Sequence, residues 1–242
     1  MNVESYLRKR QELSEQAPQY RQLCLTCRQP QFSCFCCFVQ KFDPKIKFMI
    51  LIHPIEFRRR IATGRMSHLC LKNSELIIGQ NYSDNKSVNQ VLQNPKNHCV
   101  ILYPGPASVD LTQMSMETRQ NLFPSDKQLV IFVIDGTWAT ARKMVFQSKN
   151  LFHLPRLCFT PPAPSNFRVR KQPAPECYST IEAIHHTLKL LGPSQGFDLS
   201  ANSHDKLLFV FDKMVEKQLE FIDRSKELPR ATTYRRMSRR PA

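Results

Sequence analysis

Five short apolar runs, separated by segments with helical periodicity, constrain the fold more than any other feature of this sequence. The runs are KIKFMILI, ELII, HCVILY, QLVIFVI and LCF, which begin at residues 45, 75, 98, 128 and 157. Their length and their β-branched and aromatic content are typical of buried strands. Helix-like segments are expected over residues 56–71, 87–93, 138–146 and 180–191. This alternation predicts an α/β fold, with a mainly parallel sheet flanked by helices.

The chain is poor in glycine, and this excludes two common phosphate-binding motifs. It has 6 Gly in 242 residues, and no two of them form a Gly-x-Gly sequence. Both the dinucleotide fingerprint and the P-loop need glycines where the backbone approaches phosphate. Any nucleotide-derived cofactor must therefore be held by a different backbone arrangement.

The charge of the chain indicates a polyanionic partner. Lys and Arg number 35 against 20 Asp and Glu, for a formal net charge of +15. Nucleic acid is the expected partner, because basic residues release counterions when they meet phosphates. An acidic membrane surface is the rival, but it calls for one long amphipathic basic helix that the sequence lacks. Simple surface solubilisation is the third possibility.

No segment is expected to cross or enter a membrane. The longest apolar runs, 48–52 and 129–134, are far shorter than the roughly 18 residues that a spanning helix needs. The charged start MNVESYLRKRQELSEQ lacks the apolar stretch of a signal peptide. A cytoplasmic location is therefore expected.

Composition divides the chain into six parts. We expect an N-terminal arm over residues 1–22, a cysteine-rich element over 23–40 and the main α/β domain over 41–192. A linker rich in Gly, Ser and Asn follows over 193–204. An amphipathic C-terminal helix over 205–224 and a basic tail over 225–242 complete the chain.

Four cysteines have the spacing of a zinc site. Cys24, Cys27, Cys34 and Cys36 lie in CLTCRQPQFSCFC, and their short internal turns allow four thiolates to converge on one ion. Clustered cysteines in an intracellular protein are more often metal ligands than disulfides. A closed four-sulfur shell leaves no position for water, so the zinc would be structural. A redox pair and cysteines without a shared role are the alternatives, and Cys37 could replace Cys36 as the fourth ligand.

An acidic residue follows the most apolar predicted strand. Asp135 begins the string Asp135-Gly136-Thr137-Trp138, which leads into a helix. Ligands of parallel sheets collect beyond the carboxyl ends of the strands, where this carboxyl group is expected. Trp138, the only Trp in the chain, could stack on a base. The competing interpretation is that Asp135 caps the helix and Trp138 packs in the core.

A second helix start carries polar side chains. Ser179 and Glu182 have the spacing of a capping box around Thr180, and a helix N-terminus also attracts carboxylates. The basic stretch before it contains Arg168, Arg170 and Lys171. His185 and His186 follow without a Cys or carboxylate at ligand spacing along the helix, so a metal role is not expected for them.

Taken together, these pieces resemble the DTW-domain proteins, the family of tRNA-uridine aminocarboxypropyltransferases, and the bacterial members in particular. The resemblance covers residues 24–191 through the cysteine cluster, HPIEFRRRIATGR, ILYPGPAS, DGTWATARKM, FRVRK and STIEA, in the family's order. One departure is Ala62-Thr63-Gly64, where the family commonly has Asn-Thr-Gly.

The resemblance implies a fold and an activity. It implies a SPOUT-like core with a knotted pocket for S-adenosylmethionine, and transfer of the 3-amino-3-carboxypropyl group to N3 of a tRNA uridine. It also implies Asp135 as the base, since uridine N3 must lose its proton to become a nucleophile. Such a base needs burial to raise its pKa. Asp135 could instead hold the ammonium group or the uracil edge.

Binding residues follow from these placements. The candidates for cofactor contacts are Leu102, Tyr103, Pro104, Gly136, Thr137, Trp138, Ser179, Thr180 and Glu182. The candidates for phosphate contacts are Arg58, Arg59, Arg60, Arg65, Arg168, Arg170 and Lys171. Two other functions stay open at this point: an RNA methyltransferase that uses the same cofactor, and a zinc-containing RNA-binding module without activity.

Overall fold

The computed structural model describes residues 4–5, 7–8, 22–59, 61–170, 174 and 177–227. Within these residues, six strands form one sheet in the order β2-β1-β5-β3-β6-β4, and every neighbouring pair is parallel. The strands are β1 (Lys47–Ile52), β2 (Ser74–Ile78), β3 (Asn97–Leu102), β4 (Val109–Asp110), β5 (Gln128–Asp135) and β6 (Arg156–Cys158). The predicted α/β fold with a mainly parallel sheet is confirmed.

Side chains of the central strands alternate between two cores. Phe48 and Ile50 of β1 belong to one buried cluster, whereas Met49 and Leu51 belong to the other. This two-residue period is the one a strand imposes. Because both faces are covered, the central strands are apolar throughout, and this is why they were visible in the sequence.

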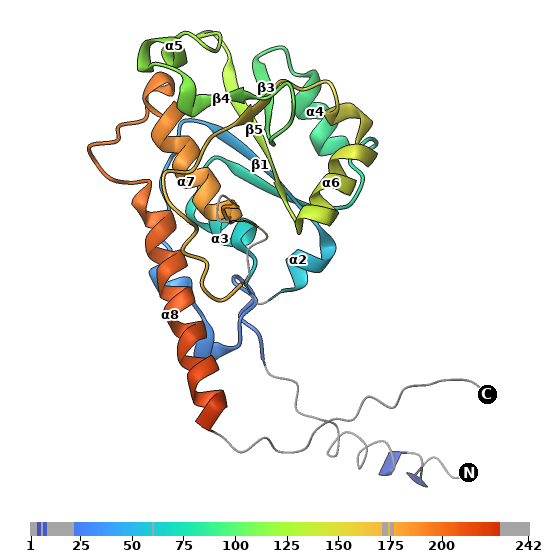
Figure 1. Ribbon diagram of the computed structural model, residues 1–242. Helices are drawn as coiled ribbons and strands as arrows, with labels where there is room; N and C mark the ends of the chain where they lie inside the picture. The colour runs from blue at the N-terminus through green and yellow to red at the C-terminus, as the bar shows by residue number, and fades with distance from the viewer. Residues whose placement is uncertain are drawn as a thin grey trace, which may run out of the picture.

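Helices cover both faces of the sheet (Figure 1). On one face lie α3 (Thr63–Cys70), α7 (Thr180–Leu191) and α8 (Asp205–Glu227), whose apolar residues join the first cluster. On the other lie α4 (Lys86–Gln93) and α6 (Trp138–Gln147), which join the second. The cysteine-rich element contains the 3₁₀ turns η1 (Gln31–Ser33) and η2 (Cys36–Phe38) and packs against α8.

The single helix predicted over residues 56–71 is wrong, because the structure divides it in two. A short helix, α2 (Pro54–Arg58), ends just before Arg59, and α3 begins after Ala62. Both of these flanking residues have extended backbone. The Arg65 guanidinium donates to the carbonyl oxygens of Phe57 (2.9 Å) and Arg59 (3.2 Å). A side chain from the next helix thus satisfies carbonyl groups at the end of α2, so the chain can turn without leaving them unpaired.

Short elements escaped the sequence pattern. They are β4, α5 (Met116–Gln120) and the turns η3 (Leu111–Gln113), η4 (Lys149–Leu151) and η5 (Pro193–Gln195). The segment predicted as a linker, residues 193–204, contains η5 and buries the side chains of Phe197 and His204. It therefore packs as part of the body that joins α7 to α8. Across the described ranges, no helix has both the length and the apolarity needed to traverse a bilayer.

We expect Phe132→Ala, in the middle of β5, to lower the free energy of unfolding by about 3–5 kcal/mol, because it empties a site with 0% exposure. Phe146→Ala removes the same atoms at 78% exposure and should change stability by less than about 0.5 kcal/mol. Urea denaturation of both variants measures this. Equal losses in the two would contradict the assigned core.

Candidate active site and metal centre

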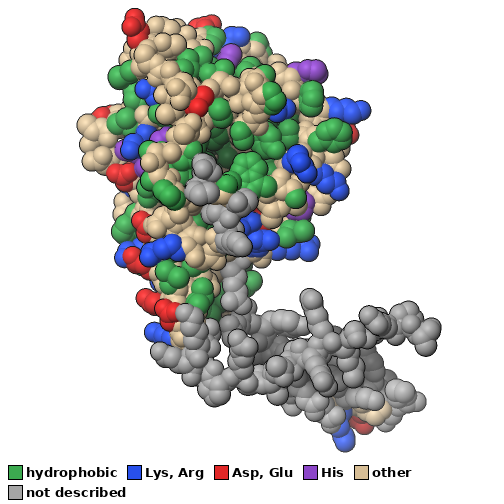
Figure 2. Space-filling view, in the orientation of Figure 1, with side chains coloured by type: hydrophobic (Ala, Val, Ile, Leu, Met, Phe, Trp, Pro, Cys, Tyr) green, Lys and Arg blue, Asp and Glu red, His purple; other side chains and the backbone are tan. Residues whose placement is uncertain are grey.

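A cavity of about 470 Å³ opens at the carboxyl edge of the sheet. The ends of β3, β5 and β6 form its floor, and the first residues of α6 and α7 form its sides. Figure 2 shows this hollow surrounded by hydrophobic side chains. Its volume lies in the range usual for small-molecule sites, about 300–1,000 Å³.

The cavity gathers most of the residues expected to contact a cofactor. Eight of them line it: Leu102, Tyr103, Pro104, Gly136, Thr137, Trp138, Ser179 and Thr180. Glu182 does not, because its carboxylate accepts hydrogen bonds from Ser179 and from the loop residues Ser165 and Asn166. The expectation of a cofactor contact from Glu182 is therefore corrected: the capping box and the loop occupy its carboxylate.

Asp135 lies in the cavity wall with a side chain that is 5% exposed. Its Oδ2 accepts from the backbone N–H of Gly64 (3.0 Å), and its Oδ1 accepts from the hydroxyl of Thr180 (2.8 Å). Burial raises the pKa of Asp135 to about 6, against the lowering effect of these two hydrogen bonds. A carboxyl group of this kind is a stronger base than a free one and still ionises near neutral pH.

The interpretation of Asp135 as a helix cap and Trp138 as a core residue is wrong. The cap of α6 is Thr137, whose hydroxyl accepts from the N–H of Thr140 (3.2 Å). The Trp138 side chain is 48% exposed and lines the cavity. Both side chains are thereby available to a ligand.

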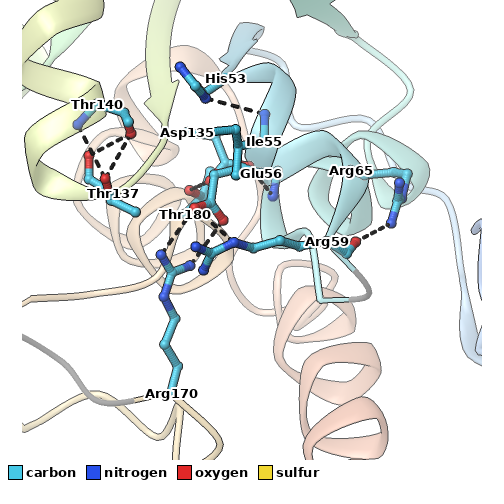
Figure 3. A network of polar contacts seen from close by, with 11 residues as sticks. His53, Ile55, Glu56, Arg59, Arg65, Asp135, Thr137, Thr140, Arg170 and Thr180 are labelled. Carbon is cyan, nitrogen blue, oxygen red and sulfur yellow. Dashed lines mark hydrogen bonds and ion pairs between the residues drawn. The ribbon is translucent and has the colours of Figure 1, made fainter. Parts of the chain in front are cut away.

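A buried ion-pair network borders Asp135 (Figure 3). Glu56 of α2 is 2% exposed, and Arg170 approaches its two carboxylate oxygens at 3.1 and 3.2 Å. Arg59 reaches the same carboxylate at 3.3 Å. The negative charge of Glu56 contributes to the raised pKa of Asp135, and Arg170 opposes it. Glu56 stood in the motif HPIEF, but its burial gave no signal in the sequence.

The basic residues expected to contact phosphates differ in their exposure and in their partners. Arg58 and Arg168 are exposed and available to phosphates. Arg59 and Arg170 are engaged with Glu56. The expectation that Arg65 contacts a phosphate is corrected, because its side chain is 4% exposed and donates to backbone carbonyls. Arg60 and Lys171 lie outside the described residues.

The departure at Ala62 affects a helix end. Ala62 occupies the N-cap position of α3 and supplies no side-chain hydrogen bond. Asn is among the best residues at such a position. In this chain the N–H of Gly64, in the first turn of α3, is satisfied by Asp135 instead.

The four predicted cysteines converge on one point. The Sγ atoms of Cys24 and Cys36 are 3.7 Å apart, those of Cys27 and Cys34 are 3.5 Å apart, and all four lie within 4.8 Å of one another. Bonds of about 2.3 Å in a tetrahedral shell place sulfur atoms roughly 3.8 Å apart, so this donor set fits zinc. Cys37 is exposed and stands outside the group, and this favours Cys36 as the fourth ligand.

The cysteine element contacts the helices beside the cavity. The guanidinium of Arg28, which follows Cys27, lies 4.8 Å from the ring centre of Phe57 in α2. The guanidinium of Arg65 in α3 lies 5.5 Å from the same ring. Lys217 of α8 donates to the carbonyl oxygen of Cys34 at 3.0 Å. The element therefore contacts α2 and α8 directly and meets α3 at the Phe57 ring.

A second group of possible metal ligands was missed because its members are distant in sequence. His185 Nε2 lies 2.9 Å from Asp205 Oδ1, and His204 stacks on His185 with ring centres 4.9 Å apart. Burial lowers the pKa values of both histidines. The expectation drawn from α7 by itself was thus no guide, since Asp205 of α8 supplies a carboxylate. The His185 to Asp205 contact joins the two helices without any ion.

Comparisons with known proteins agree with this arrangement. The family model for the DTW domain matches residues 21–219. The chain is 26% identical over 184 residues to tRNA-uridine aminocarboxypropyltransferase 2 of Macaca fascicularis, covering 74% of this chain and 60% of that protein. The mouse protein of the same name, from Mus musculus, is 29% identical over 173 residues, covering 69% and 56%.

A third relative of the same name, from Drosophila melanogaster, is 25% identical over 186 residues, covering 74% of this chain and 70% of that protein. The match thus spans less than two thirds of the length of the two mammalian relatives. No solved structure gives a significant match.

We expect Cys27→Ala to lose the bound zinc and to lower the melting temperature, because three thiolates no longer close the shell and the metal's binding energy contributes to folding. Cys37→Ala is the matched control and should keep one zinc per chain. Elemental analysis with thermal denaturation of protein purified without chelators decides this. Full zinc in Cys27→Ala would exclude the proposed ligand set.

Proposed function

The chain belongs to the DTW-domain family, and we propose on this premise that it is a tRNA-uridine aminocarboxypropyltransferase. The proposal is that it transfers the 3-amino-3-carboxypropyl group of S-adenosylmethionine to N3 of a uridine in tRNA. Relatives that carry this name support the proposal. A cytoplasmic location and the bacterial type within the family remain predictions.

The observation that carries the proposal is a buried carboxyl group that lies in the cavity wall and has a raised pKa. Asp135 is held by Gly64 and Thr180 at the edge of a space large enough for a small molecule. Its pKa of about 6 suits a base that must be ionised at neutral pH and still accept a proton. Uridine N3 is an imide that becomes nucleophilic when its proton leaves, and Asp135 accepts that proton.

The cavity fits the proposed cofactor. Apolar side chains from β3 and β6 line one side, and the N-termini of α6 and α7 present polar groups on the other. Leu102, Tyr103 and Pro104 would border the adenosine. Gly136, Thr137, Ser179 and Thr180 would face the polar end, because helix N-termini attract carboxylates. When bound, S-adenosylmethionine supplies a carbon activated by a sulfonium leaving group.

A SPOUT-like knot around the pocket is part of the proposal, as is a structural zinc held by the four cysteines. The parallel sheet with its cavity at the carboxyl edge supports the first. The convergence of four thiols supports the second. The zinc element acts at a distance from the reaction, by fixing α2 and α3 beside Asp135.

Trp138 is placed to receive the target base. It is half-exposed in the cavity wall, three residues after Asp135. A uridine of folded tRNA must leave its stack to be modified, and an aromatic face replaces the lost stacking. Arg58 and Arg168 are the predicted phosphate contacts that stay exposed.

We expect Asp135→Asn to abolish modification while tRNA and cofactor still bind, because the amide cannot accept the N3 proton. The experiment incubates protein with S-adenosylmethionine and unmodified tRNA transcripts, then weighs the digested nucleosides. A gain of one aminocarboxypropyl group in the wild type supports the proposal. A gain of one methyl group selects the methyltransferase, and no gain with any tRNA favours the RNA-binding module.

The single-turnover rate should depend on the ionisation of Asp135. Because only the ionised form accepts a proton, the rate should rise about tenfold per pH unit below 6 and level off above that pKa. The Thr180 hydroxyl lowers the pKa of Asp135, so Thr180→Val should move the inflection to higher pH. A profile without an inflection near pH 6, or one that Thr180→Val leaves in place, would remove Asp135 as the base.

A further inference from the structure

The outer face of α6 carries a row of exposed side chains, of which only Trp138 has a role in the proposed function. Trp138, Arg142 and Phe146 follow one another at intervals of four residues, so they lie along one side of the helix. Phe146 is 78% exposed and Trp138 is 48% exposed. These three residues are called the α6 ridge below. It begins at the cavity and runs about 12 Å away from it.

Exposed aromatic groups of this size call for a partner. A free-standing Phe exposed by more than three quarters leaves its apolar surface in water, which costs about 25 cal/mol per Å². Just beyond the ridge, Phe152 is 54% exposed. By contrast, the inner residues of α6, Met144 and Val145, are buried against the sheet. The ridge is therefore a surface feature and contributes little to the core.

The chain segment that contains the ridge carries charge of one sign. Between Gly136 and Asn166 the chain contains Arg142, Lys143, Lys149 and Arg156 and no acidic residue. Figure 2 shows Lys and Arg side chains gathered with hydrophobic ones over α6, beside the hollow. Aromatic faces set among cations match single-stranded nucleic acid, whose bases stack and whose phosphates are negative.

Contacts of Arg156 join the cavity rim to Phe152, just beyond the ridge. The guanidinium of Arg156 lies 5.7 Å from the ring centre of Tyr103, which lines the cavity, and 5.9 Å from that of Phe152. Burial raises the pKa of Tyr103, and the charges of Arg156 and Arg142 oppose this rise, so both cations lie close to the cavity rim. A single nucleic-acid strand that leaves the cavity at Trp138 would therefore continue directly onto the ridge.

From these observations we infer that the α6 ridge binds the RNA strand next to the target uridine. Phe146 stacks on a flanking base, and Arg142 contacts a phosphate. The ridge length matches roughly three to four base steps of about 3.4 Å each. The inference rests on the proposed function, since it takes the bound polyanion to be tRNA.

A second copy of the chain is a less suitable partner for the α6 ridge than RNA. A twofold interface would place the ridge against its own image, so Arg142 and Lys143 would meet cations of the same kind. Like charges in direct opposition destabilise an interface. RNA brings the opposite charge to the same surface.

The test measures binding of a fluorescently labelled, unmodified tRNA transcript to the full chain by anisotropy. Phe146→Ala should weaken binding about tenfold, and Phe146→Tyr should restore most of it, because the ring is what stacks. Arg142→Ala should reduce the slope of log Kd against log salt by about one. Lys127→Ala removes an exposed cation just before β5, at the opposite edge of the sheet, and should change affinity less than Arg142→Ala does.

Several readouts keep the inference separate from the proposed function. In the modification assay, Phe146→Ala should raise KM for tRNA and leave KM for S-adenosylmethionine unchanged. If wild-type protein binds tRNA but modifies none, the proposed function fails while the ridge stands. If it modifies tRNA and Phe146→Ala binds as tightly as wild type, the ridge is overturned. The inference would also be overturned if Phe146→Ala changed the oligomeric state of the protein in solution and left its affinity for tRNA unchanged. That result would assign this face to self-association.

Discussion

The site depends on one buried carboxyl group held between two helix starts. Asp135, at the end of β5, accepts from the N–H of Gly64 in the first turn of α3 and from the hydroxyl of Thr180, the first residue of α7. Position 64 must be glycine for this contact, because a Cβ there would collide with the Asp135 carboxylate. The sheet, α3 and α7 therefore meet at this group, which is both buried and paired.

Opposing influences set the basicity of that carboxyl group. Burial and the nearby charge of Glu56 raise its pKa, while the hydrogen bonds from Thr180 and Gly64 and the charge of Arg170 lower it. The helix N-termini favour the ionised form as well. The result, about 6, lies between a free carboxyl group and one buried without partners. Glu56 and Arg170 therefore affect the site without touching a reacting atom.

The cysteine element contacts the helices around this carboxyl group. Arg28 and Arg65 both contact the ring of Phe57, so the element, α2 and α3 meet at one side chain. Lys217 and the ring pairs Phe32 with Phe221 and Phe38 with Phe209 fix the element to α8. A metal that orders the four cysteines would also steady α2 and, through the Phe57 ring, α3, whose Gly64 N–H meets Asp135. The outer face of α6 is free of these constraints and stays open to a large ligand.

The sequence alone determined the layered α/β fold, the cysteine spacing and the placement of Asp135 beyond a strand, because each of these rests on periodicity or on neighbours in the chain. It also marked the start of α7, since a capping box is local. Tertiary structure alone decided the division of the helix at Arg59, the burial of Glu56, the withdrawal of Arg65 and Glu182 from binding roles, and the meeting of His185 with Asp205. Each of these depends on a hydrogen bond or ion pair between residues distant in sequence or on burial by another element, and neither leaves a pattern in the order of residues.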